Sequence, residues 1–158
     1  MHHATAYAAV QSSAQIARNA ALLELADRLV GYLSEQLVQS LGLQTTVRRV
    51  LISAETQRHA IARRAISSKI DSELVAQRIA EAFANARYLL LPQQYPQVFR
   101  LVGHAKSADR WLVLPLKFIR SQQPGVQEDE FWVRTAYPIG RKKKQKAQAK
   151  GLLRDLAL

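Results

Sequence analysis

The sequence predicts an α+β protein whose helices come first and whose antiparallel sheet follows. Two segments before residue 84, residues 5–41 and the segment from residue 71 or 72 onward, carry apolar residues at three- and four-residue steps, which is typical of amphipathic helices. After Pro92 and Pro96 the pattern changes to extended runs rich in β-branched and aromatic residues. A chain of 158 residues with 48% hydrophobic content can bury a core, so we expect helices packed on a small sheet.

The N-terminal segment, residues 5–41, predicts one or two amphipathic helices. Its apolar residues at helical spacing are Ile16, Leu22, Leu25, Leu29, Leu33 and Leu37. Gly31 can interrupt this run, and Gly42 is suited to end it, because glycine adopts a positive φ without a side-chain clash. The apolar stripe either packs on the rest of the chain or serves as a linker in a larger parent protein.

The net charge changes sign near the end of this segment. Residues 1–46 hold two basic and three acidic side chains, a net charge of −1, whereas residues 47–158 hold 21 basic and nine acidic ones, a net charge of +12. We therefore expect residues 1–42 to form a helical N-terminal segment and residues 43–158 to form a basic α+β domain that carries the function.

The middle of the chain predicts a strand and two helices. Residues 46–52 suit a short strand because they are rich in β-branched side chains. Ser53 can cap a helix over residues 54–64. A further helix begins at Asp71 or Ser72, and its predicted buried face consists of Leu74, Val75, Ile79, Ala82 and Phe83.

Three extended runs predict the sheet, at residues 97–102, 110–120 and 130–137. Short polar connections between them make an antiparallel meander the simplest topology. Pro115 lies inside the middle run and has no N–H to donate, so we expect a sheet edge or a bulge at that position. Residues 142–156 predict a terminal basic helix, or a tail that becomes helical when it docks.

Several functional classes are disfavoured by what the sequence lacks. It has no apolar run of about 18 residues, so we expect no membrane-spanning helix, and it has no Cys for disulfides or thiolate zinc sites. We expect no metal or cofactor, because Glu128, Asp129 and Glu130 are consecutive and cannot converge on one ion from a strand. His2 and His3 lie at the extreme terminus, where residues fray. The side chains that remain as candidates for catalysis or binding are those of His, Lys, Arg, Thr and Tyr.

The net charge of +11 favours a polyanionic partner. RNA or DNA is the first candidate, with an acidic membrane surface or an acidic protein as alternatives and simple solubility as the plainest explanation. The charge is densest in a C-terminal basic block, in which each cation that neutralises a phosphate adds to the salt dependence of binding. This block consists of Arg141, Lys142, Lys143, Lys144, Lys146 and Lys150.

The polar residues suit metal-independent cleavage of RNA by its own 2′-hydroxyl, which needs a base, an acid and fixed cations around the phosphorane. His titrates closest to neutral pH, and His59 lies four residues before Arg63 on one helix face. His104 lies two residues before Lys106 in a predicted loop, where backbone N–H groups and Ser107 can approach a phosphate. Plainer explanations exist, since a lone helical His is often an ordinary surface or packed residue and the loop can be a simple turn.

The predicted strands add further cations and hydroxyls. Lys117 alternates with apolar neighbours, so it either extends to the rim of the sheet or faces a site. The Arg134 guanidinium can donate a pair of charge-assisted hydrogen bonds to a phosphate. Thr135 and Tyr137 can each add a hydroxyl hydrogen bond, although Tyr137 would serve equally well in the core. Neighbouring strands would carry these residues and His104 toward one edge or face of the sheet.

Four motifs follow one another in the basic part of the chain: ISAET at 52–56, HAIARR at 59–64, WLVLPLK at 111–117 and WVRTAY at 132–137. Their order resembles that of the barnase, EndoU, colicin and RelE-like (BECR) ribonuclease group. This group occurs in phage proteins and in the C-terminal toxins of contact-dependent inhibition and related polymorphic toxin systems. The resemblance covers residues 47–140, with the helix His and the final Thr-x-Tyr as its most specific elements.

The resemblance implies a small fold with helices packed on an antiparallel sheet, and metal-independent endoribonuclease activity that leaves a 2′,3′-cyclic phosphate. Members often cut tRNA, and toxin members act in the bacterial cytoplasm as the C-terminal part of a larger secreted protein. A dedicated immunity protein holds such toxins inactive, and the basic face here leads us to expect an acidic one.

The resemblance also assigns roles to residues of this chain. His59 is base or acid, the cations stabilise the phosphorane, and the two hydroxyls position the phosphate. Arg63 and Arg64 stand where many relatives carry a second His, so His104 is our candidate for the second proton carrier. The predicted catalytic residues are His59, His104, Lys106, Lys117, Arg134, Thr135 and Tyr137. The predicted RNA-binding residues are Arg63, Arg64, Arg141, Lys142, Lys143, Lys144 and Lys146.

Two other functions stay open at this point. The same cations can merely follow backbone phosphates in a nucleic-acid-binding module without catalysis. Alternatively, the chain is a structural phage or secretion component whose N-terminal helices pair with another protein.

Overall fold

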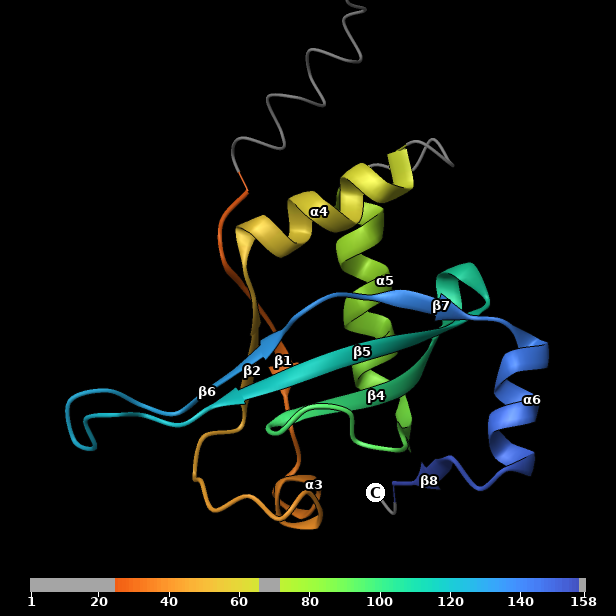
Figure 1. Ribbon diagram of the computed structural model, residues 1–158. Helices are drawn as coiled ribbons and strands as arrows, with labels where there is room; N and C mark the ends of the chain where they lie inside the picture. Colours follow the sequence, from red (N-terminus) through yellow and green to blue (C-terminus); the bar gives the residue numbers. More distant parts are fainter. Residues whose placement is uncertain (1–24, 66–71, 157–158) are drawn as a thin grey trace, which may run out of the picture.

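The computed structural model describes residues 25–65 and 72–156 and confirms the α+β class (Figure 1). One eight-stranded sheet runs through the molecule. Its strands are β1 (Arg28–Tyr32), β2 (Arg49–Ile52), β3 (Ala86–Leu90), β4 (Val98–Ala105), β5 (Arg110–Ile119), β6 (Glu130–Val133), β7 (Tyr137–Ile139) and β8 (Leu153–Asp155). The described helices are α3 (Glu35–Ser40), α4 (Ala54–Ala65), α5 (Ser72–Ala84) and α6 (Arg141–Ala149), with a short 3-10 turn, η1 (Lys106–Ala108). None of the helices in the described part is long and apolar enough to span a membrane.

The strands lie in the order β1-β2-β6-β5-β4-β3-β8, and β7 pairs with β5 beyond the end of β6. Every pairing is antiparallel except that of β2 with β6, which is parallel. The predicted antiparallel meander is thus confirmed for β4, β5 and β6. The parallel pair puts the C-terminal ends of β2 and β6 at the same edge of the sheet.

The third predicted strand is split into β6 and β7 at the level of Pro115. Along β5, β6 pairs from Leu116 onward and β7 pairs up to Val113, so residues 134–136 belong to neither strand. The carbonyl of Pro115 still accepts the N–H of Arg134 at 2.8 Å, but Pro115 has no N–H to donate in return. Pro115 therefore lies neither at a sheet edge nor, in its pairing with β4, at a bulge, and it is the neighbouring strand that is interrupted beside it.

The predicted helix across residues 28–32 is wrong, because this segment is strand β1 and pairs with β2. A register shift between Leu29 and Gly31 marks a bulge in this pair. A Cβ at Gly31 would lie 2.7 Å from the ring of Phe83, so the close packing of β1 on α5 requires glycine here. The leucine spacing also fits a helix, but β1 gains its hydrogen bonds from a partner strand that local spacing does not reveal.

Residues on both sides of the boundary predicted at residue 42 share one core. Helix α3 begins after Ser34, whose Oγ accepts the Leu37 N–H at 3.0 Å. It ends before Gly42, which has the expected positive φ, here 74°. Leu33 and Leu37 are buried in the main core together with residues of the later strands. The predictions for residues 1–24 lie outside the described part of the chain.

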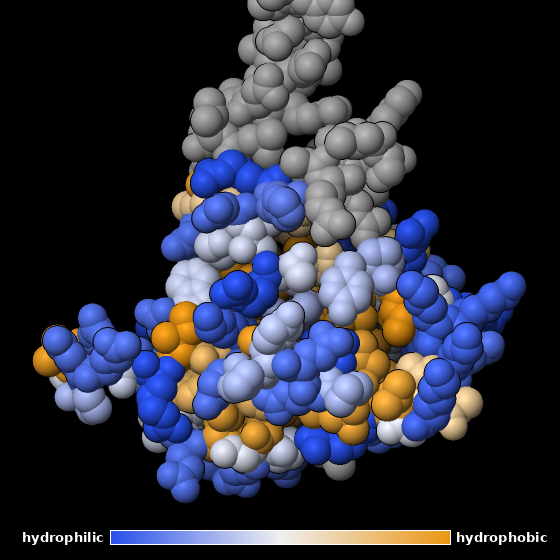
Figure 2. All heavy atoms as spheres, in the orientation of Figure 1, coloured by the Kyte–Doolittle hydropathy of each residue, from blue (hydrophilic) through white to orange (hydrophobic). Residues whose placement is uncertain are grey.

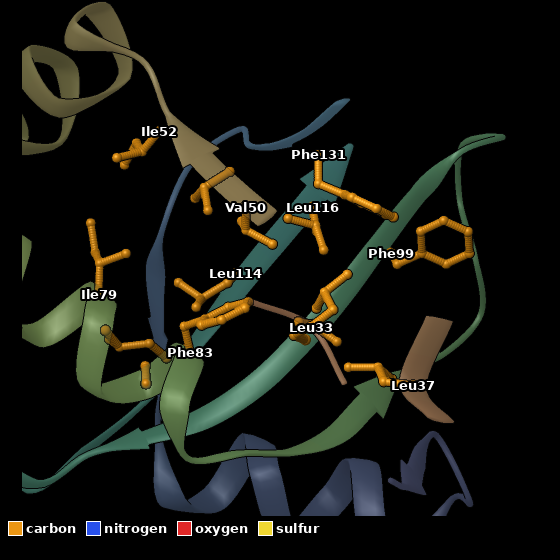
Figure 3. Packing of buried hydrophobic residues seen from close by; sticks show 14 of the residues in the cluster. Leu33, Leu37, Val50, Ile52, Ile79, Phe83, Phe99, Leu114, Leu116 and Phe131 are labelled. Atoms are coloured by element: carbon orange, nitrogen blue, oxygen red, sulfur yellow. The ribbon is translucent and has the colours of Figure 1, made fainter. Parts of the chain in front are cut away.

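The main core fills the space between one face of the sheet and helices α3 and α5 (Figure 3). Its largest buried side chains include Phe118, Phe131, Leu33, Leu101, Leu114 and Leu116. Helix α5 contributes the predicted buried residues Val75, Ile79, Ala82 and Phe83. The side chain of Leu74 lies outside the described part. Each large apolar side chain buried here contributes about 1.5–3 kcal/mol, so this layer holds the helices on the sheet.

The opposite face of the sheet carries a second, smaller cluster next to α6. Its buried members are Tyr88, Val102 and Val113, with Leu90, Trp111, Ile139 and Leu153 packed against them. After α6 the chain turns at Gly151, which has a φ of 70°, and enters β8 beside β3. The basic helix predicted over residues 142–156 is therefore correct for α6 and wrong for β8.

Candidate active site

An open groove of about 520 Å³ lies where β2 passes into α4. Its walls come from the first turns of α4, the last residues of β5, and the end of β6 with the residue that follows it. The lining residues are Ser53, Glu55, Thr56, His59, Lys117, Ile119, Trp132, Val133 and Arg134. We call this site the α4–β6 groove. It brings together three predicted catalytic residues that are far apart in the chain, His59, Lys117 and Arg134.

The parallel pairing of β2 with β6 assembles the α4–β6 groove. Ile52 at the end of β2 lies opposite Val133 at the end of β6, so the start of α4 and Arg134 leave the sheet side by side. On its other side, β6 pairs with β5, and Trp132 lies opposite Lys117. Directly opposite residues share a sheet face, so the ring of Trp132 and the ammonium stem of Lys117 are neighbours.

Helix α4 presents two groups that can transfer protons to the groove. Ser53 caps the helix, because its Oγ accepts the N–H of Thr56 at 3.0 Å and donates to Thr56 Oγ1 at 2.9 Å. Gln57 faces the other way, since only 4% of it is exposed and its amide donates to a backbone carbonyl at 2.8 Å. Glu55 and His59 are exposed and lie four residues apart, which places a carboxylate and an imidazole on the same helix face.

Lys117 and Arg134 supply positive charge on the opposite wall. Arg134 is exposed, and its backbone is held by the bond to Pro115 described above. Lys117 is half-buried between its sheet neighbours Trp132 and Val98. Neither cation has an ion-pair partner among the described residues. Two unpaired cations beside an imidazole favour the binding of an anion.

His104 lies at the other end of the sheet and not in the groove. It pairs with Trp111, which is six residues from Lys117 along β5, or about 20 Å at ~3.3 Å per residue. Its Nε2 lies 3.0 Å from Asp109 Oδ1, and its ring centre lies 5.2 Å from that of Trp111. The predicted convergence of His104 with Lys117 is therefore not observed.

The phosphate-binding loop predicted at residues 103–107 is also wrong, because the segment consists of the end of β4 and part of η1. Gly103 serves packing, since a Cβ there would lie 1.8 Å from a backbone oxygen of α5. Ser107 donates its N–H to the Glu81 carboxylate at 2.9 Å, and this bond lowers the pKa of Glu81. Lys106 is exposed in η1, outside the α4–β6 groove. The Ser107 N–H is thus already satisfied.

The remaining predicted residues surround the groove without lining it. Thr135 is half-buried between β6 and β7. Tyr137 begins β7, is 37% exposed and shares a sheet face with Lys117, about 13 Å along β5 from it. Arg63 and Arg64 belong to the second half of α4, and their side chains lie outside the described part.

Five of the six cations of the basic block are exposed, on α6 or at its C-cap, in a region where Figure 2 shows hydrophilic side chains gathered. The exposed cations are Arg141, Lys142, Lys143, Lys146 and Lys150. Lys144 differs, because its Nζ lies 4.1 Å from the ring centre of Trp111 and 5.3 Å from that of Tyr88. Burial lowers the pKa of Lys144, and the charge of Arg87 lowers it further. Lys144 therefore packs α6 onto the sheet.

A second cavity, of about 370 Å³, lies between β1 and α5. Its walls are mostly apolar, with Leu29, Val75 and Ile79 next to the amide of Gln57. Among the described residues, no imidazole or carboxylate lines it, so it lacks the proton-transfer groups that line the α4–β6 groove. Within residues 25–65 and 72–156, no group of three or more His, Asp or Glu side chains could hold a metal ion.

Comparisons with protein-family models, with curated proteins and with solved structures find no match for this chain. The site is therefore defined by its own geometry. Several lining residues, with Glu55, Trp132 and Ile119 among them, are not predicted catalytic or RNA-binding residues. Glu55 has a local signal, its four-residue spacing from His59. Trp132 has none that distinguishes it from a packed strand residue.

Proposed function

We propose that this protein is an endoribonuclease that needs no metal and cleaves RNA by attack of a 2′-hydroxyl on the adjacent phosphate. The observation that carries this proposal is the presence of His59, Lys117 and Arg134 in one open groove. An imidazole can transfer a proton, and two cations can stabilise the charge that gathers on a phosphorane. The resemblance to the BECR group supports the same chemistry at these positions.

Glu55 and His59 share the two proton transfers. The carboxylate of Glu55 takes the proton of the 2′-hydroxyl as the 2′-oxygen bonds to phosphorus. The protonated imidazole of His59 gives its proton to the 5′-oxygen as the bond between phosphorus and that oxygen breaks. The products are a 2′,3′-cyclic phosphate and a 5′-hydroxyl. Glu55 thus takes the role that the sequence suggests for His104, since Glu55 lines the groove and His104 does not.

The cations and hydroxyls hold the RNA. Arg134 can give a phosphate two parallel hydrogen bonds, and Lys117 acts as a point charge beside it. Tyr137 lies on the sheet face between the groove and the α6 end. A strand bound in the groove can therefore continue past Thr135 and Tyr137 to the exposed cations of α6, whose contacts with phosphates add affinity without sequence preference.

The biological role that fits this activity is that of a toxin. By resemblance, it would act in the bacterial cytoplasm as the C-terminal part of a larger secreted protein, with tRNA among its targets. The net charge of +12 over residues 47–158 supports an acidic immunity protein as the partner that neutralises it.

Cleavage of total bacterial RNA in EDTA tests the activity. Wild-type protein should give discrete fragments that end in a cyclic phosphate, and His59→Ala should give none. His104→Ala is the matched control, and it should cleave like the wild type. Far-UV circular dichroism checks that both variants are folded. Intact RNA at every wild-type concentration, or full activity of His59→Ala, would overturn the proposal.

A nucleic-acid-binding function without catalysis is the second candidate, and the exposed cations of α6 favour it. None of them has an ion-pair partner among the described residues. Changing Lys142, Lys143 and Lys146 together to Gln should reduce the salt slope of RNA binding by up to about three, one for each lost phosphate contact. Under this second function, the wild type shifts RNA on a native gel and leaves it intact.

A further inference from the structure

Trp132 occupies a position in the α4–β6 groove for which the cleavage chemistry has no use. It lines the groove and is only half-buried, beside Lys117. Its indole Nε1 donates to Glu130 Oε2 at 2.6 Å, which restrains the ring. Ile119 lies opposite Glu130, is 41% exposed and lines the same groove. A flat aromatic ring and an apolar side chain thus stand next to the phosphate-binding cations.

The environment of Trp132 differs from that of Trp111. The ring of Trp111 is covered by Lys144 at 4.1 Å, His104 at 5.2 Å and Tyr88 at 5.9 Å. Within the described residues, no aromatic ring or cation is stacked on Trp132. An aromatic side chain that is left partly exposed in a cationic groove offers a surface on which a ligand ring can stack.

We propose that Trp132 and Ile119 form a subsite for an unpaired nucleobase, so that the substrate is single-stranded RNA or the loop of a folded RNA. This deepens the proposed function and rests on the same groove. A base in a duplex is stacked on both faces and cannot lie on an indole, whereas an unpaired base can be turned outward. Its phosphate then reaches Lys117 and Arg134, which lie beside the ring.

The subsite should accept different bases. Stacking on an aromatic ring tolerates any base, because every base has a π-face. The Nε1 donor of Trp132 is already engaged by Glu130 and is not free to read a base edge. We therefore expect a preference for unpaired nucleotides over paired ones, with weak discrimination among bases at this position.

Binding of 2′-O-methyl RNA tests the subsite without cleavage, because this RNA lacks the attacking hydroxyl. Full-length protein should bind a single-stranded oligonucleotide more tightly than the matching duplex at the same salt concentration. Trp132→Ala should weaken single-strand binding about tenfold, and Trp132→Phe, which keeps an aromatic ring, should retain most of it. An oligonucleotide of abasic residues keeps the phosphates, so its binding should not depend on Trp132.

Fluorescence provides an independent readout, because the chain has two Trp residues. Trp111→Phe leaves only Trp132, whose emission should be quenched by the single-stranded oligonucleotide. Trp132→Phe leaves only Trp111, whose emission should change little. Equal affinity of wild type and Trp132→Ala, or quenching of Trp111 alone, would overturn the subsite.

These outcomes are separable from those of the cleavage test. If the wild type cleaves RNA and Trp132→Ala binds normally, the subsite is wrong and the activity stands. If RNA is never cleaved but Trp132 is quenched, the subsite stands as part of a binding module and the enzyme proposal fails.

Discussion

The two ends of one sheet contain the same three residue types in different surroundings. Each end brings together a His, a Trp and a Lys: His59, Trp132 and Lys117 in the α4–β6 groove, and His104, Trp111 and Lys144 beside α6. Beside α6 the three side chains contact one another or a nearby carboxylate. In the groove they line an open volume of about 520 Å³, and no described residue pairs with its His or Lys.

This difference shows that residue type alone is a weak guide to function. A His or a Lys that already has its partners contributes to stability, whereas the same residue left unpaired at a surface is available to a ligand. Helix α6 supplies the partners at one end. At the other end the strand β2 stops at Ile52 and a helix begins, so the neighbouring face of β6 stays open.

The largest expected effect separates the two histidines. His59→Ala should lower kcat/KM for RNA cleavage about 10²–10⁴-fold, which is the usual contribution of a general acid or base. His104→Ala should leave kcat/KM close to the wild-type value, because His104 lies about 20 Å from Lys117 along the sheet. Initial rates on a fluorescent RNA substrate measure both. Equal losses in the two variants would show that the two ends act together.

Substitution of the groove lysine should also lower activity more than substitution of the α6 lysine, but by a smaller factor than for the two histidines. Under the proposed function, Lys117→Ala should lower kcat about 10²-fold, because it would remove a cation that stabilises the transition state. Lys144→Ala should leave kcat unchanged, since its ammonium is packed against Trp111. Steady-state kinetics separates kcat from KM, so a change confined to KM in Lys117→Ala would assign that residue to binding alone.

For stability, unlike activity, the substitution beside α6 should have the larger effect, so Trp111→Ala should destabilise the fold more than Trp132→Ala. Trp111→Ala removes a ring that packs under α6, and we expect a loss of about 2 kcal/mol, or about 4–8 °C in melting temperature. Trp132→Ala should cost less than about 1 kcal/mol, because no aromatic ring or cation is stacked on that ring among the described residues. Thermal melts followed by circular dichroism compare the two variants. A larger loss for Trp132→Ala would mean that the groove end is the better packed one.

The smallest effect concerns pH and Lys144. Burial lowers its pKa in the folded state below the ordinary 10.5, so the folded protein binds this proton less tightly than the unfolded chain does. The cost of the charged form is therefore present at neutral pH and is relieved as pH rises through the folded pKa toward 10.5.

Urea unfolding of the wild type and of Lys144→Met at several pH values measures this effect. The stability of the wild type relative to the variant should rise toward alkaline pH, by less than about 1 kcal/mol because the side chain is partly exposed. A difference that stays constant with pH would show that the packing of α6 does not lower the pKa of Lys144.

Elements with a strong local signal could be predicted from the sequence. Ser53 caps α4 as expected, and the apolar face of α5 is buried. The strand beside β5 is interrupted at Pro115, where proline lacks its N–H, although the edge or bulge itself is not found there. The strands that were missed are β1, β3 and β8, of three to five residues each. Such short strands are stabilised by their neighbours, so local sequence carries little information about them.

For the candidate site too, the residue types could be predicted from the sequence, but their meeting in space could not. His59, Lys117 and Arg134 can be selected from the sequence, since proton transfer and phosphate binding need those residue types. Their meeting depends on the parallel contact of β2 with β6, which joins segments about 80 residues apart. His104 has the same chemical type as His59, but the register of β4 and β5 carries it to the other end of the sheet.

Composition and local periodicity predict the helices, the longer strands and a charge that favours a polyanionic partner, because these properties depend on each residue and its near neighbours. Contacts between distant segments decide which residues share the groove. They also decide which His has an ion-pair partner, and which Trp a stacked ring or cation, among the described residues. Those contacts are set by strand register and by the burial of one common core, and neither property belongs to any single segment.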